Sequence, residues 1–531
     1  EFDKRINLAK KAMKDKEKWG FLQAQGVLLT DEPALPDKAK VAHMYPGQGS
    51  QYVGMTYDLH KRYTSVQKVW EKSDETMVEV LDGETLSSFV LRHNLSKEDL
   101  VESEHKLKQT EYTQPAMLTA DLAIERALND HGQMPDMVAL DENGQARKFG
   151  SRRHYSFSHQ GYQKESQRIT QAVAERYGQN KFVQAWQTDN EYGCHETTYS
   201  WCMSSLSEFR VWLKRKYKNI DELNKSWGNV FWSMEYRSFE EIGLPNLTVT
   251  EANPSHNFDF RKFSSDQVKN FNSQQVEIIN QNSPGRPVSH NYMGHFVEFD
   301  HREVSKDLDI VAWNSYPLGN LQNMQIIARE DKQLINDCYN IGDPDFQSYH
   351  HDLYRGMGRL WIMEQQPGPV NWAKYNPVPV DGAVRMWTWE AFAHDAEVVS
   401  YFRWRQAPFA QEQMHSALML RDNTPAVGSL EALQVSKEIQ MIELPATQKS
   451  EIALLHDYEA CWITELDGQT EDFHYTRLML DFYKSVRVNG GSLDIIGKND
   501  DFHGYKLIII CLLYTSPSPR DLSTSPMPSS A

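Results

Sequence analysis

Two short apolar runs in this chain each lead to a glutamate. The first run covers residues 182–186 and leads through polar residues to Glu191, and the second covers residues 360–363 and ends at Glu364. Polar sequence that contains glycine follows each glutamate, as expected where a buried parallel strand opens into a loop. Carboxylates at the carboxyl ends of strands are typical of the sites of (β/α)8 barrels. The spacing fits the fourth and seventh strands of one such barrel.

A pair of carboxylates at one edge of a barrel favours chemistry on a glycosidic bond. In a retaining glycosidase one carboxyl protonates the leaving oxygen while the other attacks the anomeric carbon. The alternative is that both glutamates are ordinary surface or ion-paired residues, which is the commoner situation for any single glutamate. Asparagine, tryptophan and glycine surround both positions, and this shared context favours the paired interpretation.

Composition narrows the class of protein. With 531 residues, of which 40% are hydrophobic, the chain can bury several cores and should hold two or three domains. A formal charge of −17 argues against nucleic acid or an anionic membrane as a partner. The 5 cysteines are odd in number, scattered and not preceded by a signal peptide, which indicates a reduced, cytoplasmic protein. No apolar run approaches the roughly 20 residues of a membrane span.

Several segments between about residues 134 and 510 resemble glycoside hydrolase family 42 β-galactosidases. They occur in the order found in that family and cover residues 150–155, 189–193, 231–237, 244–254, 313–318, 363–372 and 402–408. The resemblance implies a retaining β-galactosidase that hydrolyses terminal, non-reducing β-D-galactosyl residues of a β-galactoside by double displacement. It implies no cofactor, and it implies the homotrimer of the family.

The resemblance also implies roles for individual residues. Glu191 would be the general acid/base, which must hold a proton near neutral pH, and Glu364 would be the nucleophile, roughly 5 Å away. Asn190 would hydrogen-bond the 2-hydroxyl of the sugar. The other substrate-binding residues that it implies are Arg152 (in preference to Arg153), Tyr316, Trp372, Glu412 and His415.

A metal site is not expected. Some family members carry a structural zinc held by four cysteines, and the first of those positions is Ser156 in this chain. Only Cys194 and Cys202 lie near the others. Because a zinc site needs three or four soft ligands, we expect no bound metal.

Residues 1–133 have a different character. A lysine-rich amphipathic helix is predicted within residues 1–20, and residues 46–52 and 109–118 resemble malonyl-CoA:acyl-carrier-protein acyltransferases, in particular the acyltransferase domain of polyunsaturated fatty acid synthases. In such domains the loop corresponding to residues 47–51 lends a backbone N–H to the oxyanion hole. The Gly-x-Ser-x-Gly elbow and the histidine base that should follow are absent from this sequence. An acyltransferase is therefore the alternative function, and the fragment is expected to lack a catalytic centre.

The barrel itself is expected to be incomplete, because the first two strands of the family precede the segment that begins here at about residue 134. A helical apolar stripe is predicted at residues 206–217, between the fourth and fifth strands. The third to eighth strands are predicted at residues 147–155, 182–188, 288–291, 308–313, 360–363 and 398–404.

The expected fold class is α/β throughout. An acyltransferase-like fragment (1–133) precedes an incomplete TIM (β/α)8 barrel (134–446). Residues 447–510 follow as a partial trimerisation domain, a truncated flavodoxin-like α/β domain. Residues 511–531 are rich in serine and proline, resemble translated sequencing adapter and should be disordered. A chimera without any activity is the remaining alternative.

Overall fold

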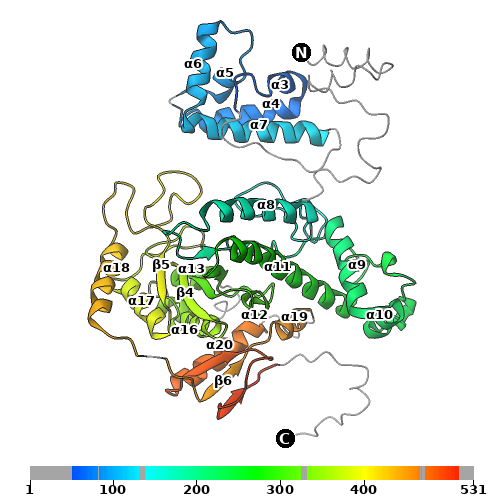
Figure 1. Ribbon diagram of the computed structural model, residues 1–531, viewed down its shortest axis with the longest axis vertical. Coiled ribbons are helices and arrows are strands. Elements are labelled where there is room, and N and C mark those ends of the chain that lie inside the picture. Colours follow the sequence, from blue (N-terminus) through cyan, green and yellow to red (C-terminus); the bar gives the residue numbers. More distant parts are fainter. Residues whose placement is uncertain are drawn as a thin grey trace. The chain divides into compact units, whose positions relative to one another are not determined.

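A computed structural model describes residues 51–81, 83–130, 138–323, 332–445, 447–466, 468, 470 and 473–512. The chain divides into two compact units, Glu1–Asp136 and Met137–Ala531 (Figure 1), and each is described by itself. Four features predicted from the sequence lie outside the described residues. They are the helix within residues 1–20, most of the loop at 46–52, the junction near 134 and the tail from residue 513.

The described residues of the N-terminal unit form helices that surround one small core. Trp70 and Val66 of α4 are fully buried there, and the indole N–H of Trp70 donates to Thr56 Oγ1 at 3.0 Å. Residues 109–118, which carry the resemblance to acyltransferases, lead into and begin the longest of these helices. The helices are α3 (Tyr57–Arg62), α4 (Thr64–Met77), α5 (Leu86–Val90), α6 (Lys97–Leu107) and α7 (Thr110–Asp130).

The second unit is built on a parallel sheet of five strands in the order β1-β2-β3-β4-β5. All neighbouring strands are parallel, and each strand follows its neighbour along the chain. β3 is buried on both faces, as expected for a strand covered by helices on one side and core on the other. The strands are β1 (Trp186–Gln187), β2 (Val288–Met293), β3 (Ile310–Ser315), β4 (Arg359–Gln365) and β5 (Val398–Tyr401).

Helices connect these strands and pack around the sheet (Figure 1), so that the curled sheet with its helices fits a TIM-barrel-like fold. The apolar stripe predicted at residues 206–217 lies on α9, where Phe209 and Leu213 are fully buried. The helices are α8 (Gln160–Tyr177), α9 (Met203–Tyr217), α10 (Ile220–Trp227), η2 (Phe231–Ser233), η3 (Phe239–Glu241), α11 (Pro254–Asn282), α12 (His301–Ser305), α13 (Pro317–Asn323), α15 (Lys332–Cys338), α16 (Pro344–Arg355), α17 (Ala383–Ala393), α18 (Val427–Glu438) and η4 (Ile439–Met441).

Two predicted strands differ in the structure. Residues 147–155 form no strand and take part in a single isolated antiparallel bridge, between Tyr155 and Val138, because their run of charged residues and glycine lacks the apolar content of a buried parallel strand. Of residues 182–188 only Trp186 and Gln187 pair with β2, and Phe182 is 80% exposed. The prediction of a third strand at 147–155 is therefore wrong, and the fourth is shorter than predicted.

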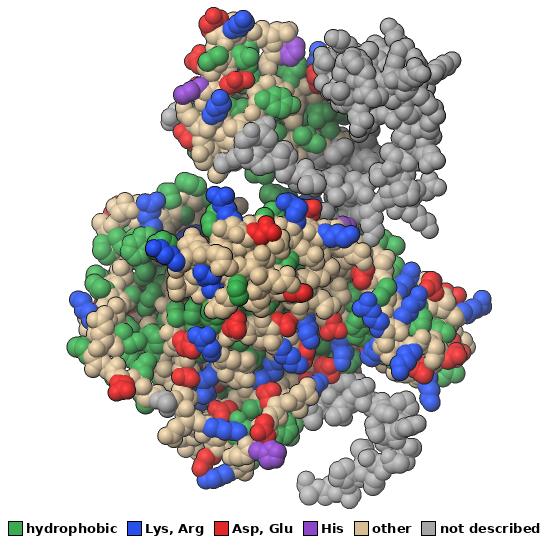
Figure 2. All heavy atoms as spheres, in the orientation of Figure 1, with side chains coloured by type: hydrophobic (Ala, Val, Ile, Leu, Met, Phe, Trp, Pro, Cys, Tyr) green, Lys and Arg blue, Asp and Glu red, His purple; other side chains and the backbone are tan. Residues whose placement is uncertain are grey.

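The described sheet has two open edges, since β1 pairs only with β2 and β5 pairs only with β4 among the described strands. Apolar side chains on α18, near β5 in the chain, are also uncovered: Val427, Leu430 and Leu433 are each more than half exposed. Hydrophobic side chains gather over this side of the unit (Figure 2). Open strand edges and exposed apolar faces are the features through which a sheet pairs with other chains.

The C-terminal part adds a second, three-stranded parallel sheet in the order β7-β6-β8. It shares a core with the barrel, in which Tyr483 and Leu454 lie with Tyr349 and Leu353 of α16. No helix among the described residues is long and apolar enough to cross a membrane. Its elements are β6 (Ile452–Leu455), α19 (Tyr458–Leu466), α20 (Tyr475–Val488), β7 (Leu493–Ile496) and β8 (Leu507–Ile509).

Candidate active site

A cavity of about 650 Å³ includes residues from the carboxyl ends of β3 and β4 in its lining. The other lining residues come from β2, from the loops before α8 and α9, from the loops after β2, β3, β4 and β5, and from α13. All the site residues predicted from the sequence line this one cavity: Arg152, Asn190, Glu191, Tyr316, Glu364, Trp372, Glu412 and His415.

Asn314 connects the two glutamates. The register of β3 and β4 shifts after Trp313, and Asn314 of β3 then lies beside Glu364 of β4. The amide of Asn314 donates to Glu191 Oε1 at 2.7 Å. Strand β4 thus carries Glu364 into the cavity, and the neighbouring strand β3 holds Glu191 through the side chain of Asn314.

The other oxygen of Glu191 also has partners. Asn190 Nδ2 donates to Oε2 at 3.4 Å, and Arg152 Nη2 lies 3.3 Å from the same oxygen. Asn190 is itself held by Asn291 of β2, whose Nδ2 donates to Asn190 Oδ1 at 2.9 Å. Donors from two loops and from one strand therefore fix the carboxylate of Glu191 in one orientation.

The loop that carries Glu191 turns sharply. Asp189 and Glu191 both have a φ of 46°, and Gly193 has a φ of 79°. A Cβ atom at Gly193 would lie 2.2 Å from Thr198 Oγ1 and 2.7 Å from the ring of Phe296. Glycine is required there both for its backbone conformation and for the close approach of its neighbours.

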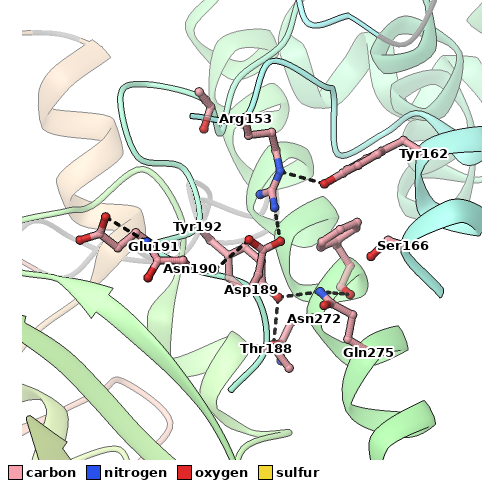
Figure 3. A network of polar contacts seen from close by, with 12 residues as sticks. Arg153, Tyr162, Ser166, Thr188, Asp189, Asn190, Glu191, Tyr192, Asn272 and Gln275 are labelled. Atoms are coloured by element: carbon pink, nitrogen blue, oxygen red, sulfur yellow. Dashed lines mark hydrogen bonds and ion pairs between the residues drawn. The ribbon is translucent and has the colours of Figure 1, made fainter. Parts of the chain in front are cut away.

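Arg153 anchors this loop from behind. Its guanidinium ion-pairs with Asp189, donates from Nε to the hydroxyl of Tyr162 at 3.2 Å, and lies 4.4 Å from the ring centroid of Phe157 (Figure 3). The side chain of Arg153 is only 11% exposed, whereas that of Arg152 is 39% exposed and faces the cavity. The two adjacent arginines therefore have different environments, one structural and one open to a ligand.

Further back, a buried polar cluster supports the same loop. Tyr192 receives a hydrogen bond from Gln275 Nε2 at 2.9 Å and donates to Asn272 Oδ1 at 3.3 Å. Thr188 Oγ1 donates to the same Asn272 oxygen at 2.8 Å (Figure 3). The residues on both sides of Asp189 are thus tied to α11, which gives the loop a rigid base.

Glu364 has a strongly perturbed proton affinity. Burial and the negative charge of Glu191 raise the pKa of Glu364 to about 7, although the hydroxyl of Tyr316, which donates to Glu364 Oε2 at 2.5 Å, and the charge of Arg152 oppose the rise. Burial together with the neighbouring carboxylates raises the pKa of Tyr316 well above its ordinary value. Glu364 is therefore partly protonated near neutral pH.

Aromatic rings and a third carboxylate form the far wall. Trp372 is 40% exposed and meets Tyr316 edge to face at 5.4 Å between ring centroids. His415 also packs edge to face on Tyr316, at 5.8 Å, and its pKa is lowered by burial. Glu412 Oε2 forms an ion pair of 3.0 Å with Arg403 Nη1. An apolar ring beside polar groups is the combination that suits the two faces of a sugar.

Sequence reasoning missed several residues of the cavity. Asn314 could have been predicted as a site residue, because it lies at the end of a strand and directly precedes Ser315 and Tyr316. Asn371 lies beside Trp372 and also lines the cavity. Phe296 has no comparable signal, since it comes from a loop whose position depends on the fold.

Ser156, the first of the positions related to the zinc site of the family, and Cys202 both lie beside Ser205. Ser156 Oγ lies 3.1 Å from Ser205 Oγ, and Cys202 Sγ lies 3.5 Å from the same oxygen. Cys194 lies apart from them in the lining of the cavity. Within the described residues, no group of three or more His, Cys, Asp or Glu side chains could hold a metal ion.

Comparison with known proteins identifies the family. A model described as beta-galactosidase of glycoside hydrolase family 42 matches residues 131–442, and a model of the beta-galactosidase trimerisation domain matches residues 450–518. Beta-galactosidase BgaA of Thermus sp is 47% identical over 378 residues, which are 71% of this chain and 58% of that protein. Beta-galactosidase Bga of Halorubrum lacusprofundi is 39% identical over 384 residues, or 72% and 54% of the two chains.

Solved structures agree with the sequence relatives. The crystal structure of beta-galactosidase from the psychrophilic Marinomonas ef1 superposes with a TM-score of 0.69 at 42% identity, and the match covers 83% of this chain and 69% of that one. The present chain thus spans 58% of the length of its Thermus relative and 69% of the Marinomonas chain. From residue 131 to residue 442, this chain belongs to the family 42 beta-galactosidases of the glycoside hydrolases.

Proposed function

We propose that this protein is a retaining β-galactosidase that hydrolyses terminal, non-reducing β-D-galactosyl residues by double displacement. The observation that carries the proposal is the placement of Glu191 and Glu364 in one cavity, with Asn314 beside one and bonded to the other. The names of the relatives, which are β-galactosidases, support the choice of sugar.

In the first step, a carboxylate oxygen of Glu364 attacks the anomeric carbon. The bond from that carbon to the glycosidic oxygen breaks, and Glu191 gives its proton to the departing oxygen. In the second step, Glu191 takes a proton from water, whose oxygen attacks the anomeric carbon and releases Glu364. The products are galactose and the free alcohol, and both glutamates return to their starting states.

The first step needs the proton on Glu191 and a negative charge on Glu364. Arg152 is the group that arranges this, because its exposed guanidinium reaches both the cavity and Glu191 Oε2. When a hydroxyl of the sugar engages Arg152, the cation leaves Glu191 and that oxygen can accept the proton. Glu364 then loses its proton while keeping the hydrogen bond from Tyr316.

The remaining residues bind the sugar. Asn190, held by Asn291, donates to the 2-hydroxyl as positive charge develops at the ring. Trp372 offers its indole to the apolar face of galactose, and its position is supported by Gly319, where a Cβ would lie 2.4 Å from the indole. Glu412 and His415 bind further hydroxyls from the opposite wall.

Hydrolysis of nitrophenyl β-galactoside tests the proposal, and NMR of the first product tests its stereochemistry. We expect β-galactose to appear first and to mutarotate later, since two inversions retain the configuration. Glu364→Gln should abolish turnover. Release of α-galactose first would replace double displacement by single displacement, and full activity of Glu364→Gln would remove Glu364 from the mechanism.

We further propose that the protein forms the homotrimer suggested by its trimerisation segment at 450–518. Exposed apolar residues support contact between copies: Val230, Phe231 and Trp232 are 74%, 67% and 79% exposed. Light scattering after size exclusion measures the mass directly, and a monomer at all concentrations would contradict the trimer.

We also propose a cytoplasmic location, which the free state of all the cysteines supports.

The finer assignments outside the barrel remain proposals of the same kind. The sheet β7-β6-β8 with α19 and α20 supports a flavodoxin-like half domain. On the basis of their sequence, residues 1–133 are proposed to be an acyltransferase-like fragment without a catalytic centre. The serine- and proline-rich tail from residue 511 is proposed to derive from sequencing adapter. Incubation with labelled malonyl-CoA should leave the protein unlabelled, and a malonyl-serine would contradict this assignment.

A further inference from the structure

Cys194 lines the cavity but has no part in the proposed reaction. It follows Glu191 by three positions, and the turn places its backbone N–H 3.1 Å from the carbonyl oxygen of Glu191. Its side chain is 9% exposed and lines the same cavity as both glutamates.

The thiol has two polar neighbours. Cys194 Sγ lies 3.0 Å from His195 Nδ1 on one side, and a hydrogen bond joins the thiol to the carboxylate of Glu191 on the other. Burial and the charge of Glu191 raise the pKa of the Cys194 thiol to about 12. The sulfur therefore keeps its proton at any pH at which a glycosidase works, and a protonated thiol beside a carboxylate is a hydrogen-bond donor.

We infer that Cys194 is a positioning residue for Glu191, which donates its S–H to the carboxylate and is oriented by His195. The inference rests on the proposed role of Glu191 as general acid/base. In this arrangement the Nδ1–H of His195 donates to the sulfur, the sulfur donates to Glu191, and the thiol tunes how readily the carboxyl gives up its proton.

Other charged groups act on the same carboxyl, so the thiol is one influence among several. Arg152 lies 3.3 Å from Glu191 Oε2, and both Glu364 and Tyr316 interact with the charge of Glu191. Glu412 acts on Glu364 and Tyr316, and Glu298 acts on the thiol itself. A substitution at Cys194 leaves all of these in place, which isolates the contribution of the S–H group.

Two variants at Cys194 test the inference through the pH dependence of kcat/KM. Cys194→Ala removes the donor, so the carboxylate form of Glu191 is less stabilised and the alkaline limb should move up by about half a pH unit. Cys194→Ser supplies a stronger donor, so the limb should move down by a similar amount. Cys202→Ala, which deletes a buried thiol near Ser205 and away from the glutamates, should leave the limb unchanged. A purely structural role would move both Cys194 variants in the same direction or move neither, and either result would overturn the inference.

A second measurement needs no activity. Peptide-resolved labelling with a small thiosulfonate reports the thiolate fraction at Cys194, and Glu191→Gln removes the charge that suppresses it. The labelling rate at Cys194 should rise about tenfold for each unit by which the pKa of the thiol falls, while the rate at Cys202 stays constant. An unchanged rate at Cys194 overturns the inference. If the protein hydrolyses no galactoside, the proposed function fails, and the labelling alone decides whether the thiol and Glu191 are coupled.

Discussion

Replacing Glu364 by glutamine should abolish hydrolysis and, above neutral pH, make the protein more stable. The pKa of Glu364 rises from an ordinary 4.5 to about 7, chiefly through burial and the charge of Glu191. Each pKa unit corresponds to about 1.4 kcal/mol, so ionising this group costs the folded protein about 3 kcal/mol. Glutamine keeps an oxygen that can accept the hydrogen bond from Tyr316 and never carries the charge.

The sign of the effect depends on pH. Below about pH 4.5 Glu364 is protonated in both the folded and the unfolded protein, and the two proteins should have the same stability. As the pH rises toward 7 the unfolded state loses this proton first, so the wild type loses stability that the variant retains. With an unfolding entropy of about 2.1 cal/mol/K per residue over residues 138–512, the full effect is roughly 4 °C in Tm.

Thermal melts from pH 4.5 to pH 8.5 measure the difference. Glu397→Gln is the matched control, because Arg359 lowers the pKa of Glu397 on the surface and its removal should be neutral or slightly destabilising at high pH. A Tm difference for Glu364→Gln that is absent at pH 8, or that is the same at all pH values, would refute the argument that Glu364 is a destabilising buried charge.

Three further outcomes follow from the site. Glu191→Ala should lose most activity but recover part of it with azide, which attacks the glycosyl-enzyme in place of water and needs no general base. Glu364→Gln should not recover by that route, and equal behaviour of the two variants would contradict the assigned roles. Arg153→Lys should destabilise the fold by about 2–4 kcal/mol in denaturant melts, because lysine cannot both pair and stack, whereas Arg152→Lys should raise KM with little change in stability. Dialysis against EDTA should leave Tm and kcat unchanged, and a loss that zinc restores would show a metal site.

Part of this architecture could be predicted from the sequence. Residues 310–313 form an apolar run that a parallel strand buries on both faces, and β3 begins there. β2 covers the predicted residues 288–291 although its buried side chains include Ser289, His290 and Asn291. Residues 147–155 were predicted as a strand by analogy with the family, but Phe149 is 57% exposed and the charged residues around it have no buried face to occupy. The length and polarity of a segment therefore predicted a strand better than its position in the strand order of the family did.

The finer properties of the site depend on three-dimensional relations that no local pattern contains. Asn314 reaches Glu191 only because the register shifts after Trp313. The rise in the pKa of Glu364 depends on how deeply it is buried and which charges face it. The resemblance to the family favoured Arg152 over Arg153, but the physical reason, an aromatic and acidic pocket that encloses the second arginine, appears only in the fold.

The glycine at position 193 has a consequence for how mutational data on this protein should be interpreted. Any side chain there collides with Thr198 and Phe296, and the backbone is in a region that other residues rarely adopt. In a library of random variants, position 193 would therefore tolerate as few substitutions as the glutamates of the cavity. A screen that scored only survival would rank Gly193 with the two glutamates of the cavity, although its role is only to leave room for its neighbours.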